Sequence, residues 1–305
     1  MGKIALAIHG GAGTILKSRM TDALEAEYRS GLDHALTAGW EILEKGGSSL
    51  DAVESAVASL EDFPLFNAGC GAVFTHDGEQ EMDASIMDGR RLKAGGVAAV
   101  KNIRNPVKLA RSVMERTEHI LLSGEGANQF AAEIGARTEP DEYFFTEHRW
   151  RQLIESRNAD QVRLDHAVAR PMGTVGAVAC DHHGHLAAAT STGGMTNKKF
   201  GRVGDTPLIG AGTYADDACA VSCTGHGEYF MLGVSAYDVA ARMKYKGSNL
   251  EEAAREAIYR LTSINGEGGL IAVDRSGNVT MPFNSEGMYR AWATEKDQFE
   301  IRIYR

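Results

Sequence analysis

A threonine that follows glycine, where a polar segment meets an apolar run, is the residue of this chain best placed to do chemistry. Thr174 follows Gly173 and opens the strand-like run 174–180. Peptide cleavage between the two residues would give Thr174 a free α-amine beside its hydroxyl. An α-amine has a pKa of about 7.7–8.0, so it can accept the hydroxyl proton near neutral pH. Taken alone, the four residues Gly-Thr-Val-Gly are also compatible with an ordinary strand start.

Two further segments place hydroxyl and amide donors where they could assist such a nucleophile. Thr192 lies at the end of the next apolar run, which pairs with the Thr174 run if residues 181–184 form a hairpin turn. That pairing would return the Thr192 hydroxyl to the beginning of the first strand. Thr224 and Gly225 end another apolar run, and their hydroxyl and N–H could donate to one oxyanion.

Arg202 and Asp205 place a cation and an anion three residues apart, between these two segments. An arginine can hold a carboxylate through two parallel hydrogen bonds, and an aspartate can hold an ammonium group. Together they could bind the α-carboxylate and the α-amine of an amino acid. The alternative interpretation is a surface ion pair of little energetic consequence.

Three other patterns are compatible with chemistry but favour structural roles. Residues 9–14, His-Gly-Gly-Ala-Gly-Thr, lack the ending of a phosphate loop and the glycine order of a dinucleotide motif, which predicts a tight turn with close backbone packing. The three histidines of segment 182–185 are predicted to be exposed turn residues rather than metal ligands. Cys219 and Cys223 have no matching histidine pair, so we interpret them as packing residues.

The composition describes an acidic, glycine-rich chain with ample material for a core. Its 305 residues carry a net charge of −9, which argues against nucleic acid as a partner because phosphate binding requires clustered lysine and arginine. We interpret the Lys198-Lys199 pair as solvated surface. No run approaches the roughly 18 apolar residues of a membrane span. Four cysteines without paired spacing predict free thiols and a cytoplasmic protein.

The order of the expected elements predicts an α+β fold, in which hairpins form antiparallel sheets and paired helices cover them. Ser48 or Ser49 caps a second helix, and Asn105-Pro106 opens a third. Residues 158–173 have no periodicity and form the expected linker. Helical spacing occurs over residues 22–45, 125–135, 146–157, 228–246 and 249–263, and strand-like runs occur at 1–8, 80–87, 96–101, 174–180, 186–190, 269–274, 278–281 and 287–304.

Five motifs together are typical of one known family. They are Gly-Thr-Val-Gly from residue 173, Thr-Ser-Thr-Gly-Gly-Met from 190, Gly-Arg-Val-Gly-Asp from 201, Thr-Gly-x-Gly-Glu from 224 and Pro-Leu-Phe-Asn-Ala-Gly from 64. Through them the chain resembles the plant-type L-asparaginases, also called isoaspartyl peptidases, and most of all their bacterial members. These proteins are N-terminal nucleophile (Ntn) hydrolases. The resemblance covers nearly the whole chain and implies a single domain built as a four-layer αββα sandwich.

The resemblance also implies what the individual residues do. It implies self-cleavage between Gly173 and Thr174 into an α chain (1–173) and a β chain (174–305), which stay together and associate as (αβ)2. By the same resemblance Thr174 is the nucleophile. The other matched positions are Thr192 as the hydrogen-bonding partner of the nucleophile, Thr224 and Gly225 as oxyanion and substrate contacts, Arg202, Asp205 and Gly227 as substrate contacts, and Asn67 beside the scissile group.

A loop before the second half of the chain matches a structural sodium site of the family, formed by backbone carbonyls. Carbonyl oxygens suit a hard cation whatever the side chains are. No organic cofactor is expected. The implied carbonyls belong to Leu60, Glu61, Phe63, Phe66, Ala68 and Cys70.

The implied activity is hydrolysis of L-asparagine and of β-aspartyl dipeptides to L-aspartate, two small substrates that share a free α-amine and α-carboxylate. Glycosylasparaginase is the alternative within the same fold. Those enzymes are typically secreted, disulfide-bonded and carry Asp before the nucleophile, where this chain has Gly173. An unprocessed binding protein for small amino acids is the alternative from a different class.

Overall fold

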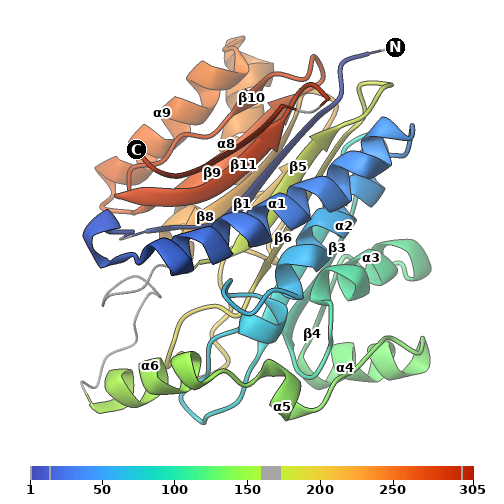
Figure 1. The fold of residues 1–305 in the computed structure, drawn as a ribbon. Helices are drawn as coiled ribbons and strands as arrows, with labels where there is room; N and C mark the ends of the chain where they lie inside the picture. The colour runs from blue at the N-terminus through green and yellow to red at the C-terminus, as the bar shows by residue number, and fades with distance from the viewer. Residues whose placement is uncertain (1, 14, 159–172, 297) are drawn as a thin grey trace.

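Two β-sheets lie face to face between layers of helices in the computed structural model, which describes residues 2–13, 15–158, 173–296 and 298–305 (Figure 1). The strands are β1 (Ala5–Gly13), β2 (Met82–Asp88), β3 (Lys93–Val100), β4 (Leu121–Ser123), β5 (Val175–Cys180), β6 (Leu186–Thr192), β7 (Thr213–Ala215), β8 (Cys219–Gly225), β9 (Gly268–Asp274), β10 (Val279–Thr280), β11 (Gly287–Ala293) and β12 (Phe299–Tyr304). The α-helices are α1 (Asp22–Glu44), α2 (Ser49–Glu61), α3 (Pro106–Arg116), α4 (Gly124–Glu133), α5 (Asp141–Phe144), α6 (Glu147–Asn158), α7 (Gly227–Gly233), α8 (Ser235–Ala241) and α9 (Leu250–Ser263).

The larger sheet has the strand order β12-β11-β1-β5-β6-β2-β3-β4, and the smaller sheet has the order β10-β9-β8-β7. Neighbouring strands are antiparallel, as predicted, except that β3 and β4 run parallel. This exception follows from the connection, because α3 carries the chain back along the sheet before β4 begins. The predicted hairpin of runs 174–180 and 186–190 is present as β5 and β6, which lie at the centre of the larger sheet.

Three hydrophobic clusters fill the spaces between the four layers. The first lies between the larger sheet and α1, α2 and α3, where Leu36 and Val57 pack with Ile8 of β1. The second lies between the smaller sheet and α8 and α9. The third joins the two sheets through side chains such as Val178 and Ile271. The chain therefore has the expected αββα sandwich.

Side-chain caps fix the ends of the helices that support the larger sheet. The Thr21 hydroxyl accepts a hydrogen bond from the Leu24 N–H at the start of α1, and the Ser48 hydroxyl accepts one from the Asp51 N–H at the start of α2. Such caps satisfy backbone donors that a helix leaves free, and each stabilises by about 1 kcal/mol. The N-cap of α2 is therefore Ser48 and not Ser49.

The prediction of a tight turn at residues 9–14 is wrong. β1 continues through this segment to Gly13 and stays paired with β11, with an irregularity of register between His9 and Gly11. Close backbone packing is confirmed, because a Cβ atom on Gly10 would lie 2.3 Å from the Phe66 ring. The absence of side chains lets the strand pass where larger residues would not fit.

The predicted helix over residues 228–246 is broken in the structure. Val234 adopts a left-handed conformation (φ 47°, ψ 47°) between α7 and α8, and a π-helical turn (Arg242–Lys246) follows α8. The carbonyls of Gly210 and Ala211 accept hydrogen bonds from Tyr237 and Ala236 in the first turn of α8. This tertiary contact provides acceptors for backbone N–H groups that have no partner within the helix at its start.

The predicted linker over residues 158–173 can be compared with the structure only at its two ends. Asn158 is still part of α6, and residues 159–172 lie outside the described residues. None of the helices in the described ranges combines the length and apolar character needed to cross a membrane.

Candidate active site

The β5–β6 hairpin brings the proposed nucleophile to its predicted partner. Val175 pairs with Ser191 in the hairpin register, so Thr174 and Thr192 face each other at its open end. The Thr174 Oγ1 donates a hydrogen bond to the Thr192 Oγ1 at 3.1 Å, and the Gly194 N–H donates to the same oxygen at 3.0 Å. The approach of these two hydroxyls is therefore confirmed.

Gly173 lies in the same cleft as the two threonines and is packed against β1. A Cβ atom on Gly11 would lie 2.5 Å from the Gly173 nitrogen, and Gly11 has φ +114°, which favours glycine. The glycine-rich end of β1 therefore sits directly against the peptide that precedes Thr174. Sequence reasoning gave this segment only a packing role.

His9 is a functional candidate that sequence reasoning missed. It is fully buried, with Nδ1 2.9 Å from the Thr174 carbonyl oxygen and Nε2 2.9 Å from the Ser222 Oγ. A carbonyl oxygen only accepts, so Nδ1 carries the proton and Nε2 accepts from Ser222. Burial lowers the pKa of His9 to about 3, which keeps the ring neutral. The ring thus holds the backbone of Thr174 in place.

The buried neutral state of His9 predicts a loss of stability in acid. Between pH 7 and pH 5 an unfolded histidine takes up a proton, whereas the folded His9, with a pKa of about 3, does not. The free energy of unfolding contributed by this residue should therefore fall by about 2 kcal/mol over that range. Urea unfolding of the Thr174→Ala chain at pH 7 and at pH 5 measures the total change in the free energy of unfolding. The same chain with His9→Gln should lack the contribution of His9 to that change. Equal pH dependence in the two chains would contradict a neutral, buried His9.

Ser222 continues into a chain of buried hydroxyls between the sheets. Because its proton goes to His9, the Ser222 Oγ accepts from Thr190 at 2.7 Å, and Thr190 accepts from Thr213 at 2.5 Å. Ser85 of β2 contacts Thr213 at 2.8 Å. These residues come from β2, β6, β7 and β8, so the chain of hydroxyls joins both sheets behind the nucleophile. Each of these four hydroxyls has a hydrogen-bond partner, as a buried polar group requires.

Asn67 connects its loop to the turn that follows Thr192. Its Nδ2 donates to the Gly194 carbonyl at 2.8 Å, and its Oδ1 accepts from the Val73 N–H at 3.1 Å. The Asn67 carbonyl also accepts from Gly193 at 3.0 Å. Asn67 lines the cleft of Thr174, as predicted. These bonds hold the position of Gly194, which in turn donates to Thr192.

Thr224 and Gly225 lie at the end of β8, next to the nucleophile's cleft. Gly225 lines the cleft, and its φ of +145° together with the 2.3 Å approach of the Glu267 carbonyl to a Cβ position favours glycine. The Thr224 Oγ1 is buried and accepts from the Ala12 N–H at 3.3 Å. Its own proton can still be donated to a second acceptor. Their role as oxyanion donors stays a prediction.

Arg202 and Asp205 both line the cleft, but Arg202 already has a partner. Its guanidinium makes two hydrogen bonds of 2.9 Å to the carboxylate of Glu228 at the start of α7. This pairing shows that Arg202 can hold a carboxylate bidentately, as predicted. A substrate carboxylate would have to share the Arg202 guanidinium with Glu228 or displace the Glu228 carboxylate from it. The Glu228 side chain is 43% exposed.

Asp205 is buried and lacks a partner for one oxygen. Among the described residues the Asp205 Oδ2 has no hydrogen bond, and burial raises the pKa of the carboxyl to about 7, against the lowering effect of Arg202. A Cβ atom on Gly227 would lie 2.7 Å from the Asp205 Oδ1 and 3.0 Å from the Arg202 Nη2. Gly227 therefore packs on both side chains. An unsatisfied buried carboxyl is suited to binding a cation.

Lys198 corrects the interpretation of Lys198-Lys199 as solvated surface. Lys198 is 2% exposed, and its Nζ donates to the Glu81 carbonyl at 2.8 Å. Burial lowers its pKa, and the charges of Asp83 and Glu81 oppose that effect. Asp83 is the register partner of Thr192 on β2. A buried cation and anion thus lie directly behind the nucleophile's hydroxyl partner.

Removing the Lys198 charge is expected to destabilise the fold. Lys198→Met leaves Asp83 buried without its main counter-charge, which should cost about 3 kcal/mol and lower the thermal midpoint. Lys198→Met combined with Asp83→Asn should recover part of that loss, because the two charges are coupled. Differential scanning calorimetry measures both, with Lys108→Met on the exposed side of α3 as the control expected to change little. If the Lys198→Met variant is as stable as the wild type, the pair of Lys198 and Asp83 is not needed for stability.

Two sheets face each other between layers of helices, and a threonine hydroxyl lies at the start of a central strand. This arrangement is typical of the Ntn hydrolases. The family model described as Asparaginase matches residues 2–303, so the chain belongs to this asparaginase family. It is 53% identical to an isoaspartyl peptidase of Salmonella typhimurium, covering 100% of both chains. It is 52% identical to an isoaspartyl peptidase of Escherichia coli, over 100% of this chain and 97% of that protein. A human protein named isoaspartyl peptidase/L-asparaginase is 46% identical, over 97% of this chain and 94% of its own.

Proposed function

We propose that the chain is a self-processing threonine hydrolase that converts β-aspartyl dipeptides and L-asparagine to L-aspartate. The observation that carries the proposal is the single cleft that joins the Thr174–Thr192 hydroxyl pair to Arg202 and Asp205. The names of the bacterial relatives, both isoaspartyl peptidases, support the substrate class. The name of the human relative adds L-asparagine.

Self-cleavage uses the hydroxyl of Thr174 on the peptide that precedes it. The Thr174 Oγ attacks the Gly173 carbonyl carbon, the C–N bond breaks, and the nitrogen takes up a proton as the free amine. Water then hydrolyses the resulting ester and leaves a carboxylate on Gly173. The contacts of His9 with the Thr174 carbonyl and of Gly11 with Gly173 support this step, because they fix both sides of the scissile peptide.

Substrate hydrolysis reuses the same hydroxyl after cleavage. The α-amine of Thr174 accepts the hydroxyl proton while Oγ attacks the side-chain carbonyl of the substrate. Thr224 and Gly225 donate to the oxyanion. The proton passes to the leaving ammonia or amino acid, and water releases aspartate from the acyl-enzyme. Arg202 and Asp205 hold the α-carboxylate and α-amine and so place the reacting amide beside Oγ.

A sodium ion bound by the loop over residues 60–70, which contains Asn67, is part of this proposal. Two carbonyl oxygens of the loop lie where only glycine leaves room for them. A Cβ atom on Gly69 would lie 2.2 Å from the Glu61 carbonyl oxygen, and one on Gly71 would lie 2.0 Å from the Phe66 carbonyl oxygen. Carbonyl oxygens are ligands that a hard cation such as sodium prefers. The proposed ligands are the carbonyls of Leu60, Glu61, Phe63, Phe66, Ala68 and Cys70. Exchange of sodium for choline in the buffer should lower the thermal midpoint, and an unchanged midpoint would contradict the site.

We also propose that cleavage yields chains 1–173 and 174–305 within one domain, and that two such pairs associate as (αβ)2 in the cytoplasm. The four buried, unpaired cysteines are consistent with a reducing compartment. Analytical ultracentrifugation should give twice the mass of one 32.8 kDa chain. A particle of 32.8 kDa would contradict the association.

The decisive test of the function is N-terminal sequencing combined with a substrate comparison. The smaller fragment should begin with Thr-Val-Gly, and the purified protein should release aspartate from β-Asp-Leu and from asparagine. Activity on N-glycosylated asparagine alone would instead support glycosylasparaginase. A single uncut band without hydrolysis would support the amino-acid-binding protein.

A further inference from the structure

A second cavity lies away from the nucleophile, beside α5 and α6. Its volume is about 370 Å³, and it shares no lining residue with the cleft of Thr174. This size lies within the range of roughly 300–1,000 Å³ that small-molecule sites occupy. The proposed reaction makes no use of this cavity.

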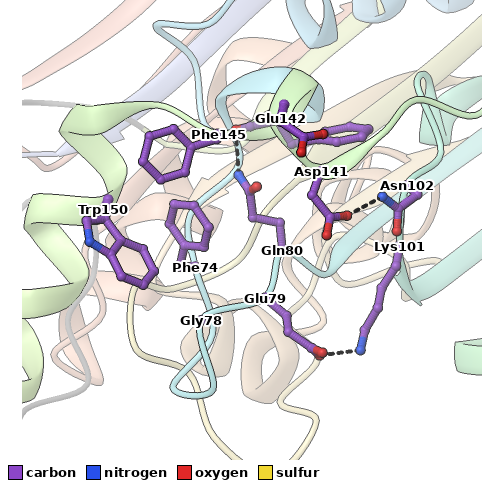
Figure 2. Close-up of a pocket in the computed structure, with 11 residues that line it drawn as sticks. Phe74, Gly78, Glu79, Gln80, Lys101, Asn102, Asp141, Glu142, Phe145 and Trp150 are labelled. Atoms are coloured by element: carbon purple, nitrogen blue, oxygen red, sulfur yellow. Dashed lines mark hydrogen bonds and ion pairs between the residues drawn. The ribbon is translucent and has the colours of Figure 1, made fainter.

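Three aromatic rings form one wall of the cavity. Phe74 packs edge-on against Trp150 at 5.3 Å between ring centroids and against Phe145 at 6.0 Å, and Phe145 lies 6.2 Å from Trp150. Figure 2 shows these rings together on one side of the cavity, with Gln80 between them and the polar side. Phe145 is 47% exposed although it is a large apolar residue. Such a wall suits the flat or aliphatic body of a ligand, and its ring faces attract cations.

The opposite side of the cavity is acidic. Asp141 and Glu142 begin α5, and Glu79 lies at the lower edge beside Lys101 (Figure 2). Lys101 is already paired with Glu79 and lies 3.8 Å from Glu81, so its charge is matched.

Asp141 and Glu142 carry the remaining negative charge of the cavity. Asp141 accepts a hydrogen bond of 2.6 Å from the neutral amide of Asn102. Within the described ranges neither Asp141 nor Glu142 forms an ion pair. Two carboxylates therefore face the cavity without a counter-charge, across from an aromatic wall.

We propose that this cavity binds an organic cation, namely a primary amine carried on an aromatic or aliphatic body. The body packs against Phe74, Phe145 and Trp150, and the ammonium group lies toward Asp141 and Glu142. Each part of the cavity then meets its physical complement: apolar surface is covered, and two unmatched carboxylates gain a cation. A carboxylate-bearing ligand of the same shape would be repelled by the same two groups.

Calorimetric titration of the purified wild-type protein, as isolated, with phenethylamine at pH 7 tests the proposal. Binding with a millimolar Kd is expected, whereas 3-phenylpropionate, which has a similar body and a negative charge, should not bind. Asp141→Asn with Glu142→Gln should weaken phenethylamine binding about tenfold. Both residues are exposed, so the variant should keep the wild-type thermal midpoint and hydrolase activity. Glu155→Gln, on the exposed surface of α6, is the matched control and should bind like the wild type.

Phenethylamine could also enter the Thr174 cleft through the amine contact of Asp205, and Asp205→Asn separates the two sites. Retained binding in Asp205→Asn and weakened binding in the Asp141/Glu142 variant support the cavity. The reverse pattern overturns it. Equal binding of phenethylamine and 3-phenylpropionate, or no binding of phenethylamine at all, also overturns it. None of these outcomes depends on the hydrolase activity, so the cavity and the proposed function can fail separately.

Discussion

Thr174→Ala is expected to give one uncut chain of 32.8 kDa with no hydrolase activity. The substitution removes the only atom that attacks in both proposed reactions, the Thr174 Oγ. The wild type should instead give two bands, and sharing 32.8 kDa by length between residues 1–173 and 174–305 gives about 19 and 14 kDa. Denaturing electrophoresis and an aspartate-release assay measure the two effects in one preparation.

Thr174→Ser is the matched control, because it keeps the hydroxyl and loses one methyl group. It should still cleave, more slowly, and should retain part of the hydrolase activity. The assignment fails if the alanine variant is cut after residue 173, because another group would then be the nucleophile. It fails as well if the alanine variant remains uncut but hydrolyses β-Asp-Leu at the wild-type rate.

Asp205→Asn is expected to lower kcat/KM by about 100-fold or more while leaving self-cleavage intact. The substrate ammonium would lose a buried charged partner, and such losses cost about 2–5 kcal/mol. Because Asp205 forms no hydrogen bond with Gly173 or with the Thr174 hydroxyl among the described residues, cleavage should proceed. Steady-state kinetics with β-Asp-Leu measure the first effect, and electrophoresis measures the second. Asp217→Asn, an exposed carboxyl in the same half of the chain, should behave like the wild type.

The pH dependence of KM gives a further test of Asp205. Burial raises the pKa of its carboxyl to about 7, so the charged form is lost as the pH falls below that value. KM should therefore rise on acidification from pH 8 to pH 6, and Asp205→Asn should lose that rise. If the variant also cleaves poorly, Asp205 supports the fold rather than the substrate.

The sequence pattern was sufficient to predict antiparallel sheets covered by helices and the meeting of Thr174 with Thr192, whereas the four-layer order came from the family resemblance. Both depend on local signals, namely helical spacing, capping residues and the turn between β5 and β6, and the hairpin register then fixes which residues face each other. The break at Val234 could not be predicted, because the helix start after it is satisfied by carbonyls of a distant loop, at Gly210 and Ala211.

The groups behind the nucleophile escaped prediction for a related reason. His9 and Ser222 are separated by 213 residues and meet only because the two sheets pack face to face. Lys198 gave a misleading signal, since a lysine beside another lysine is usually exposed. The one usable hint for His9 was its place in the strand, where an apolar run passes into consecutive glycines. The bidentate contact of Arg202 with Glu228 likewise depends on where the loop meets α7.

The strand order of the larger sheet has a consequence for the protein after cleavage. Strands from residues 1–173 and from residues 174–305 alternate in it, because β1 lies between β11 and β5, and β6 pairs with β2. The two products of a cut at Thr174 are thus interleaved, and separating them would open three strand pairings and expose bare sheet edges. Refolding the precursor is a unimolecular process, but refolding the cut protein requires two chains to find each other. Recovery from denaturation should therefore depend on concentration only after maturation, and the mature enzyme would persist through slow unfolding rather than through reversible refolding.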